Sequence, residues 1–149
     1  MKDTIPLFKV HMPRSVKEPL LETLFSGFIG QGPKVEEFEL ALTQYFKNDH
    51  VVTVNAGTSS LQLALRLANV GPGDEVITTA TSWISTSETI SQTGAKPVFV
   101  DIDEYFTIDV KKIESQINKN TKAIIPVHLY GQMCDMNEIK RISLKYNIS

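Results

Sequence analysis

The stretch NAGTSSLQLAL, from Asn55 to Leu65, places a glycine and three hydroxyl residues between an apolar run and a helix-like pattern. Ser and Thr accept hydrogen bonds from the free N–H groups of a first helical turn, so helix capping is one interpretation. The same junction could bind a phosphate through backbone N–H groups and hydroxyls, helped by the helix dipole with about 0.3–1 kcal/mol. Gly57, Thr58 and Ser59 are therefore candidate phosphate ligands. The motif matches neither the dinucleotide fingerprint nor the phosphate loop, so spacing alone leaves both interpretations open.

Two further polar junctions carry residues that could bind a ligand. EVITTATSWIST places the only tryptophan, Trp83, at the expected start of a helix. Its ring could stack on a planar aromatic ligand, which contributes about 0.5–1.5 kcal/mol beyond area burial, or it could pack between helix and sheet. PVHLYGQMCD offers His128, Tyr130 and Gln132, and His128 could bond a ligand or cap a strand. The three histidines show no metal-ligand spacing, so we expect no metal site.

A regular alternation of strand and helix patterns must position these junctions. The predicted strands are 50–54, 75–79, 96–102 and 122–128, and the predicted helices are 58–69, 83–94, 109–117 and 135–146. Such an alternation, with apolar strands, predicts an α/β fold with a parallel sheet covered on both faces. Ligands of these sheets bind beyond the carboxyl ends of the strands, where the helix N-termini lie. We therefore expect the three junctions to meet at one edge.

The first third of the chain follows a different pattern. VKEPLLETLFSGF has apolar residues at helical spacing and ends in Ser26 and Gly27, which is typical of a helix stop. GQGPKVEEFELALTQYF predicts an amphipathic helix that begins at Pro33. Its apolar face carries Val35, Phe38, Leu42 and Phe46. We expect an N-terminal arm with two helices and a glycine-rich loop over residues 1–48, and an incomplete α/β domain over residues 49–149.

The second domain is expected to be incomplete because the helix 135–146 should deliver another parallel strand, of which Asn147 to Ser149 would be the start. The chain is thus expected to be a fragment or a natural truncation. Its net charge of -2, with both signs scattered, argues against nucleic-acid and membrane partners. No apolar run approaches the ~20 residues of a membrane span, and no secretory signal opens the chain. With a single cysteine, Cys134, the sequence indicates a cytoplasmic protein.

Five ordered segments resemble one protein family. They are GFIGQGPKVEEFE, VNAGTSSLQLAL, GPGDEVITTATSWIST, GAKPVFVDID and IIPVHLYGQMCDM. In this order and spacing they are similar to the N-terminal portion of the pyridoxal-phosphate-dependent nucleotide-sugar aminotransferases of the DegT/DnrJ/StrS family. The resemblance covers nearly the whole chain. It implies part of the large domain of the aspartate-aminotransferase-like fold (fold type I), a homodimer when full length, and a length well over twice that of this chain.

The resemblance also implies roles for individual residues. Gly57, Thr58 and Ser59 would hold the phosphate of pyridoxal 5'-phosphate, and Trp83 would stack on its pyridine ring. The glycine-rich segment 27–33 would lie near the nucleotide-sugar substrate and the neighbouring subunit. Candidate substrate residues are Phe28, Gly30, Gln31 and His128. A plain turn between two helices is an equally good interpretation of each residue in that segment.

The implied reaction moves an amino group from glutamate to a keto carbon of a nucleotide-linked sugar, with pyridoxamine 5'-phosphate formed during turnover. It needs a Schiff-base lysine as covalent anchor and proton carrier, and an aspartate facing the pyridine nitrogen. Both are expected beyond Ser149, so no catalytic residue is assigned in this chain and we expect it to be inactive alone. Asp101 and Asp103, which match a strand-end motif of the family, are interpreted as loop-forming.

Two alternatives remain open at this point. A sugar dehydratase of the same wider family would keep the phosphate site and stacking ring but replace the lysine with histidine. A truncated, non-catalytic module would retain only ligand or partner binding. The resemblance further implies a role in amino-sugar biosynthesis, since products of the family commonly enter surface polysaccharides or glycosylated metabolites.

Overall fold

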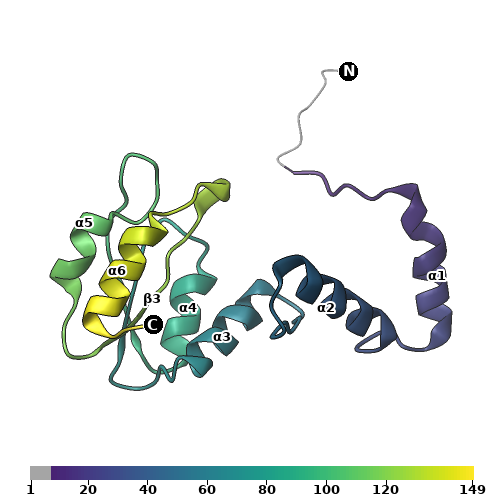
Figure 1. Ribbon diagram of the computed structural model, residues 1–149, viewed down its shortest axis with the longest axis horizontal. Coiled ribbons are helices and arrows are strands. Elements are labelled where there is room, and N and C mark those ends of the chain that lie inside the picture. Colours follow the sequence, from purple (N-terminus) through teal and green to yellow (C-terminus); the bar gives the residue numbers. More distant parts are fainter. Residues whose placement is uncertain (1–7) are drawn as a thin grey trace. The chain divides into compact units, whose positions relative to one another are not determined.

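The computed structural model describes residues 8–149, which divide into two compact units, one ending at Thr53 and the other spanning Val54–Ser149. Figure 1 shows the helices and strands of both units. The first unit holds a short 3-10 helix at Arg14–Val16 and the helices α1 (Lys17–Ser26) and α2 (Pro33–Phe46). The second unit holds the sheet and the remaining helices.

Both predicted N-terminal helices are present with the expected ends. Gly27 follows α1 with φ 82°, a left-handed conformation that glycine adopts without steric cost, and Pro33 occupies the first turn of α2. The expected apolar face of α2 is not buried, however: Phe38 is 55% exposed and Phe46 63%. No residue between 8 and 53 is buried. Periodicity correctly predicted the helix, but among residues 8–53 its apolar face is only partly covered, because Val35 and Leu42 are half-buried while Phe38 and Phe46 are exposed.

The strand predicted over residues 50–54 is absent. The segment forms no ladder with any described strand, and the Glu39 carboxylate accepts hydrogen bonds from the N–H of Thr53 at 2.7 Å and from its hydroxyl at 2.8 Å. These bonds lower the pKa of Glu39. An apolar β-branched run becomes a strand only beside a hydrogen-bonding neighbour, and here a side chain on α2 takes one of the backbone donors.

The second unit is built on a parallel sheet of three strands, as predicted. β1 (Glu75–Thr78) lies between β2 (Lys96–Phe99) and β3 (Thr121–Ile124), and both pairings are parallel. Pro97 is tolerated because β2 is an edge strand of this sheet. Beside β3, the N–H of Ser149 donates to Lys122 O at 3.0 Å, and the N–H of Ile124 donates to Ser149 O at 2.9 Å.

Helices cover both faces of the sheet (Figure 1). They are α3 (Gly57–Leu67), α4 (Ser85–Gln92), α5 (Val110–Ile113, continued by a 3-10 turn at Glu114–Gln116) and α6 (Met136–Tyr146). Ile77 of β1 packs into one apolar cluster with residues of α5 and α6, while Val76 packs into a second cluster with residues of α3 and α4. Successive strand residues thus bury opposite faces, each large side chain contributing roughly 1.5–3 kcal/mol. Among residues 8–149 no helix has the length and apolar character needed to cross a membrane.

Candidate functional site

The start of α3 lies toward the carboxyl edge of the sheet. The end of α3 is joined to the amino end of β1 by a short turn, in which the N–H of Gly71 donates to Asp74 Oδ2 at 2.9 Å. The helix therefore runs back along the strands. Leu61, in the first turns of α3, lines a hollow together with Pro126, which follows β3. Because α4 begins after the carboxyl end of β1, the first turns of both helices meet the same edge, as ligand sites in parallel sheets require.

The first residues of α3 leave donors free. Among the described residues no acceptor is found for the N–H groups of Gly57, Thr58 and Ser59, and the first helical bond to Ala56 O comes from Ser60 at 3.2 Å. No side chain caps this helix, so the hydroxyls do not perform the capping that the sequence left open. A Cβ added to Gly57 would meet no atom within 4 Å, so the space beside Gly57 at the start of α3 is open. This cradle fits a phosphate.

The two hydroxyls of this cradle differ in their partners. Ser59 Oγ donates to Asn55 Oδ1 at 2.8 Å, whereas the hydroxyl of Thr58 has no partner within residues 8–149. Asn55 thus orients one hydroxyl of the candidate site, a role that the sequence analysis missed. The sequence does contain a pattern that could have predicted this hydrogen bond, because Asn55 and Ser59 are four residues apart on either side of the start of α3.

Trp83 stands in solvent at the same edge. It lies two residues before α4 rather than inside it, and its side chain is 78% exposed, so the alternative of packing between helix and sheet is wrong. The segment that carries it is held in place. Ser82 Oγ and Thr86 Oγ1 are 2.7 Å apart, and Trp83 O accepts the N–H of Thr86 at 3.0 Å. The ring is therefore presented from an ordered segment to whatever binds beside it.

His128 shapes the loop that follows β3. Its Nδ1 accepts the N–H of Cys134 at 3.2 Å, so a neutral ring carries its proton on Nε2. The thiol of Cys134 donates to Val127 O at 3.2 Å, and burial raises the pKa of that thiol. Cys134 belongs to the apolar cluster under α6. His128 is exposed, which leaves its Nε2 side available to a ligand.

The candidate substrate residues Phe28, Gly30 and Gln31 lie in the first unit, in the loop between α1 and α2. Phe28 lines a hollow of about 340 Å³ whose other walls come from α1 and α2. Its backbone N–H bonds Ser26 Oγ at 3.2 Å. A Cβ on Gly32 would lie 2.8 Å from Phe28 Cβ, so the close approach of this loop requires glycine there. Gly30 and Gln31 are exposed in the same loop.

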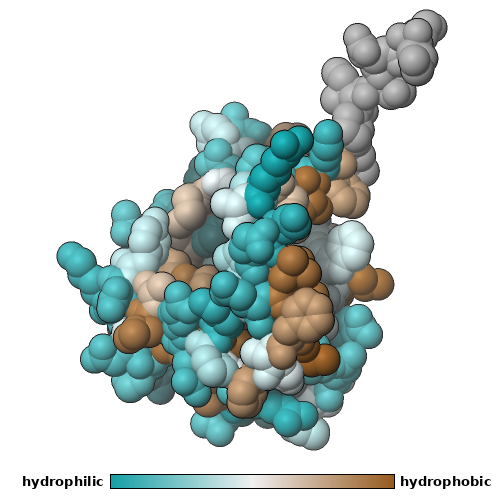
Figure 2. Space-filling view, turned by 90° about the vertical axis from the view of Figure 1, so that its right-hand side faces the viewer, coloured by the Kyte–Doolittle hydropathy of each residue, from teal (hydrophilic) through white to brown (hydrophobic). Residues whose placement is uncertain are grey.

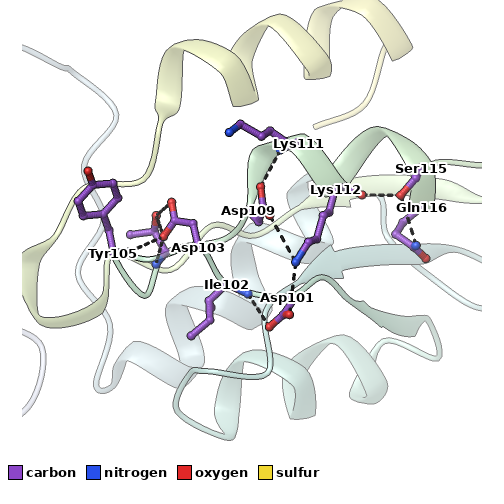
Figure 3. Close-up of polar contacts among 10 residues, drawn as sticks. Asp101, Ile102, Asp103, Tyr105, Asp109, Lys111, Lys112, Ser115 and Gln116 are labelled. Carbon is purple, nitrogen blue, oxygen red and sulfur yellow. Dashed lines mark hydrogen bonds and ion pairs between the residues drawn. The ribbon is translucent and has the colours of Figure 1, made fainter.

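The acidic strand-end motif forms a loop, as interpreted from the sequence. The Asp103 carboxylate accepts the backbone N–H groups of Tyr105 at 2.9 Å and of Thr107 at 3.0 Å. Figure 3 shows Asp103 and Tyr105 in this loop. Asp101 accepts the N–H of Ile102 at 2.9 Å and pairs with Lys112 at 3.4 Å, and these contacts lower its pKa. The partners of both carboxylates thus lie in the loop itself and in α5, which follows it. Residues 8–149 hold no cluster of three His, Cys, Asp or Glu side chains suited to a metal ion.

Comparison with known proteins identifies relatives along almost the whole chain. The spore coat polysaccharide biosynthesis protein SpsC of Bacillus subtilis (strain 168) is 44% identical over 132 residues, which are 88% of this chain and 34% of SpsC. GDP-perosamine synthase of Caulobacter vibrioides is 38% identical over 149 residues, or 97% of this chain and 40% of that protein. A candidate sugar aminotransferase of Streptococcus pneumoniae, Spr1654, was solved in its PLP form; it is 37% identical with a TM-score of 0.90, over 95% of this chain and 36% of that one.

The chain thus spans 34% to 40% of the length of these relatives. The structural neighbours confirm the predicted fold class, part of the large domain of fold type I aminotransferases. The model of the DegT/DnrJ/EryC1/StrS aminotransferase family matches residues 12–149. Since that match covers nearly all of the chain and the predicted motifs lie within it, the chain belongs to the DegT/DnrJ/EryC1/StrS aminotransferase family.

Proposed function

We propose that this chain forms the phosphate-binding and ring-binding part of a pyridoxal-phosphate site in a sugar aminotransferase. The observation that carries the proposal is the pairing of two features at one sheet edge. One is the uncapped start of α3, with free N–H groups at Gly57, Thr58 and Ser59, and the other is the exposed ring of Trp83. Support comes from the family and from relatives solved in PLP and PMP forms.

Each residue would act on a different part of the cofactor. The three N–H groups and the Thr58 hydroxyl would donate to phosphate oxygens, and such charge-assisted bonds are about twice as strong as neutral ones. The exposed face of Trp83 would pack on the pyridine ring and exclude water from that side. The cofactor, when bound, supplies an aldehyde carbon to which the amino group becomes attached, and a ring that accepts electron density.

The proposed reaction transfers an amino group from glutamate to a nucleotide-linked keto sugar, in amino-sugar or surface-polysaccharide biosynthesis in the cytoplasm. Phe28, Gly30, Gln31 and His128 are the proposed substrate residues. Phe28 already lines a hollow, and His128 is exposed with only its Nδ1 engaged within residues 8–149. GDP-perosamine synthase and SpsC, whose names concern sugar chemistry, support this substrate class.

The N-terminal unit is proposed to serve a homodimer of the full-length protein. It exposes Leu20, Leu24, Phe25, Phe38 and Phe46, and Figure 2, seen from the α1 side of Figure 1, shows hydrophobic side chains at the surface. Large apolar side chains left exposed in one unit are typical of interaction sites. We also retain the division into an arm at 1–48 and a cofactor-binding domain at 49–149 as a proposal.

The chain by itself is proposed to bind the cofactor without completing the reaction. None of its lysines matches the family's Schiff-base lysine, so it would lack the covalent anchor and the proton carrier. Sustained glutamate-dependent amination of a keto sugar by the isolated chain would contradict this.

Titration with pyridoxal phosphate tests the proposed site, because Trp83 is the only tryptophan and reports on its own contact. We expect saturable quenching of its fluorescence. Equilibrium dialysis on Trp83→Ala should give an affinity about tenfold weaker, since stacking contributes up to about 1.5 kcal/mol. Trp83→Phe keeps a ring and should bind more tightly than Trp83→Ala. Absence of saturable binding to the unsubstituted chain by both methods would overturn the proposal.

A further inference from the structure

Tyr130 is held in a strained backbone conformation with its side chain fully in solvent. It lies at the tip of the loop between β3 and α6, with φ 52° and ψ 26°, and is 100% exposed. Left-handed backbone is costly for a residue with a Cβ, and the next residue, Gly131, is left-handed as well. Within residues 8–149 the phenol gains no packing or hydrogen bond in return. Strain without an internal benefit marks a residue that acts on something else.

The loop that carries Tyr130 is tied down at its base. His128 Nδ1 accepts the Cys134 N–H at 3.2 Å, and the buried Cys134 thiol donates to Val127 O. Across the tip, the N–H of Gly131 donates to His128 O at 3.1 Å. The ring is therefore displayed on an anchored loop, and such preorganisation reduces the entropy lost when a ligand binds.

The position of the loop relates it to the proposed cofactor site. It leaves the carboxyl end of β3, and β3 is the neighbour of β1, whose carboxyl end leads to Trp83. Exposed His128 and Gln132 flank Tyr130 on the same loop. The loop as a whole therefore carries an aromatic face, an imidazole N–H and an amide, which together can offer a sugar apolar contact, donors and an acceptor.

We propose that Tyr130 is a substrate-binding residue whose ring packs against the nucleotide-linked sugar, while His128 and Gln132 hydrogen-bond its hydroxyls. This rests on the proposed function, because it assumes that a sugar nucleotide is the acceptor. The ring would raise affinity for the sugar and would leave cofactor binding unchanged.

The test measures binding of UDP-N-acetylglucosamine, dTDP-glucose and GDP-mannose to the full chain by titration calorimetry. Tyr130→Ala removes the ring and keeps the backbone strain, whereas Tyr130→Gly removes both. Both variants should lose at least tenfold in affinity for whichever probe the unsubstituted chain binds most tightly. Tyr105→Ala is the matched control, because Tyr105 is also exposed but follows β2, on the other side of β1. It should bind the probes as the unsubstituted chain does.

Several outcomes would overturn the inference. These are unchanged affinity in both Tyr130 variants, a loss in Tyr130→Ala that Tyr130→Gly restores, or no binding of any probe to the unsubstituted chain. A loss of pyridoxal phosphate binding in the Tyr130 variants would also contradict it, since the role would then be general to the site. The proposed cofactor site is judged separately by the Trp83 titration, so the two failures are distinguishable.

Discussion

Gly57 combines two properties that a phosphate site needs at the start of a helix. The space that a side chain would take is open next to the free N–H of Gly57, and the backbone there is not left-handed, so the fold itself does not demand glycine. A larger residue at position 57 should therefore be compatible with folding but not with a bound phosphate. Such a substitution tests ligand binding without disturbing the fold. Gly71, which also meets nothing within 4 Å and is not left-handed, provides the matched position away from the site.

Gly57→Ala should separate binding from folding. Alanine is a better helix former than glycine, so the melting temperature should stay the same or rise slightly. The added methyl group would enter the space proposed for the phosphate, and we expect at least tenfold weaker binding of pyridoxal phosphate by equilibrium dialysis. Gly71→Ala should leave the affinity unchanged. Equal affinity in Gly57→Ala and the unsubstituted chain would place the phosphate elsewhere.

Among the elements, the 3-10 turn after α5 is linked to α6 through one carboxylate. Glu114 accepts hydrogen bonds from Arg141 Nη2 at 2.5 Å, Lys145 Nζ at 2.7 Å and the Tyr146 hydroxyl at 2.9 Å. These partners, with Lys145 foremost, lower the pKa of Glu114 from 4.5 to about 2. Glu138, on α6, shares Arg141 and adds a like charge nearby. The contacts connect two elements that pack on one face of the sheet.

The stability of this connection should depend on pH. Because the folded pKa of Glu114 is below the unfolded one, its contribution is complete above about 4.5 and is lost as the pH falls toward 2. Melting temperatures at pH 7 and pH 3 should therefore differ less in Glu114→Gln than in the unsubstituted chain. Glu104→Gln, at an exposed loop position, should keep the full difference. An identical pH dependence in Glu114→Gln would show that these contacts do not stabilise the fold.

Over the whole molecule, burial is concentrated in the second unit. Both apolar clusters lie between residues 65 and 142 and share the central strand β1, which contributes Val76 to one and Ile77 to the other. The described part of the first unit, residues 8–53, buries no side chain. Cooperative stability should therefore reside in residues 54–149, since burial of apolar surface is the dominant favourable contribution to folding.

A chain of residues 54–149 should fold on its own. We expect a cooperative thermal transition by circular dichroism, at a melting temperature close to that of the full chain. Limited proteolysis of the full chain should cut first within residues 8–53 and leave a fragment that begins near Val54. A non-cooperative transition in the shortened chain, or early cuts inside the sheet, would mean that the first unit contributes to the core.

The sequence by itself determined the features that depend on neighbouring residues. Gly27 and Pro33 marked the helix ends, the alternation of apolar runs predicted the parallel sheet, and the order of motifs identified the family. Capping, turn chemistry and periodicity act within a few residues of the chain, so they can be read before folding. Asp101 and Asp103 were interpreted correctly as loop-forming for the same reason.

Only the tertiary structure decided which groups are left without partners. In the structure, residues 50–54 do not form the expected strand, and Trp83 is exposed instead of packed. The start of α3 has no side-chain cap, and His128 accepts a hydrogen bond from the N–H of Cys134. Tyr130 stood out only once its backbone angles and exposure were known. A ladder neighbour, an exposed face or a free N–H depends on residues distant in sequence. Local sequence patterns do not predict these features, because contacts between distant segments form only when the chain folds.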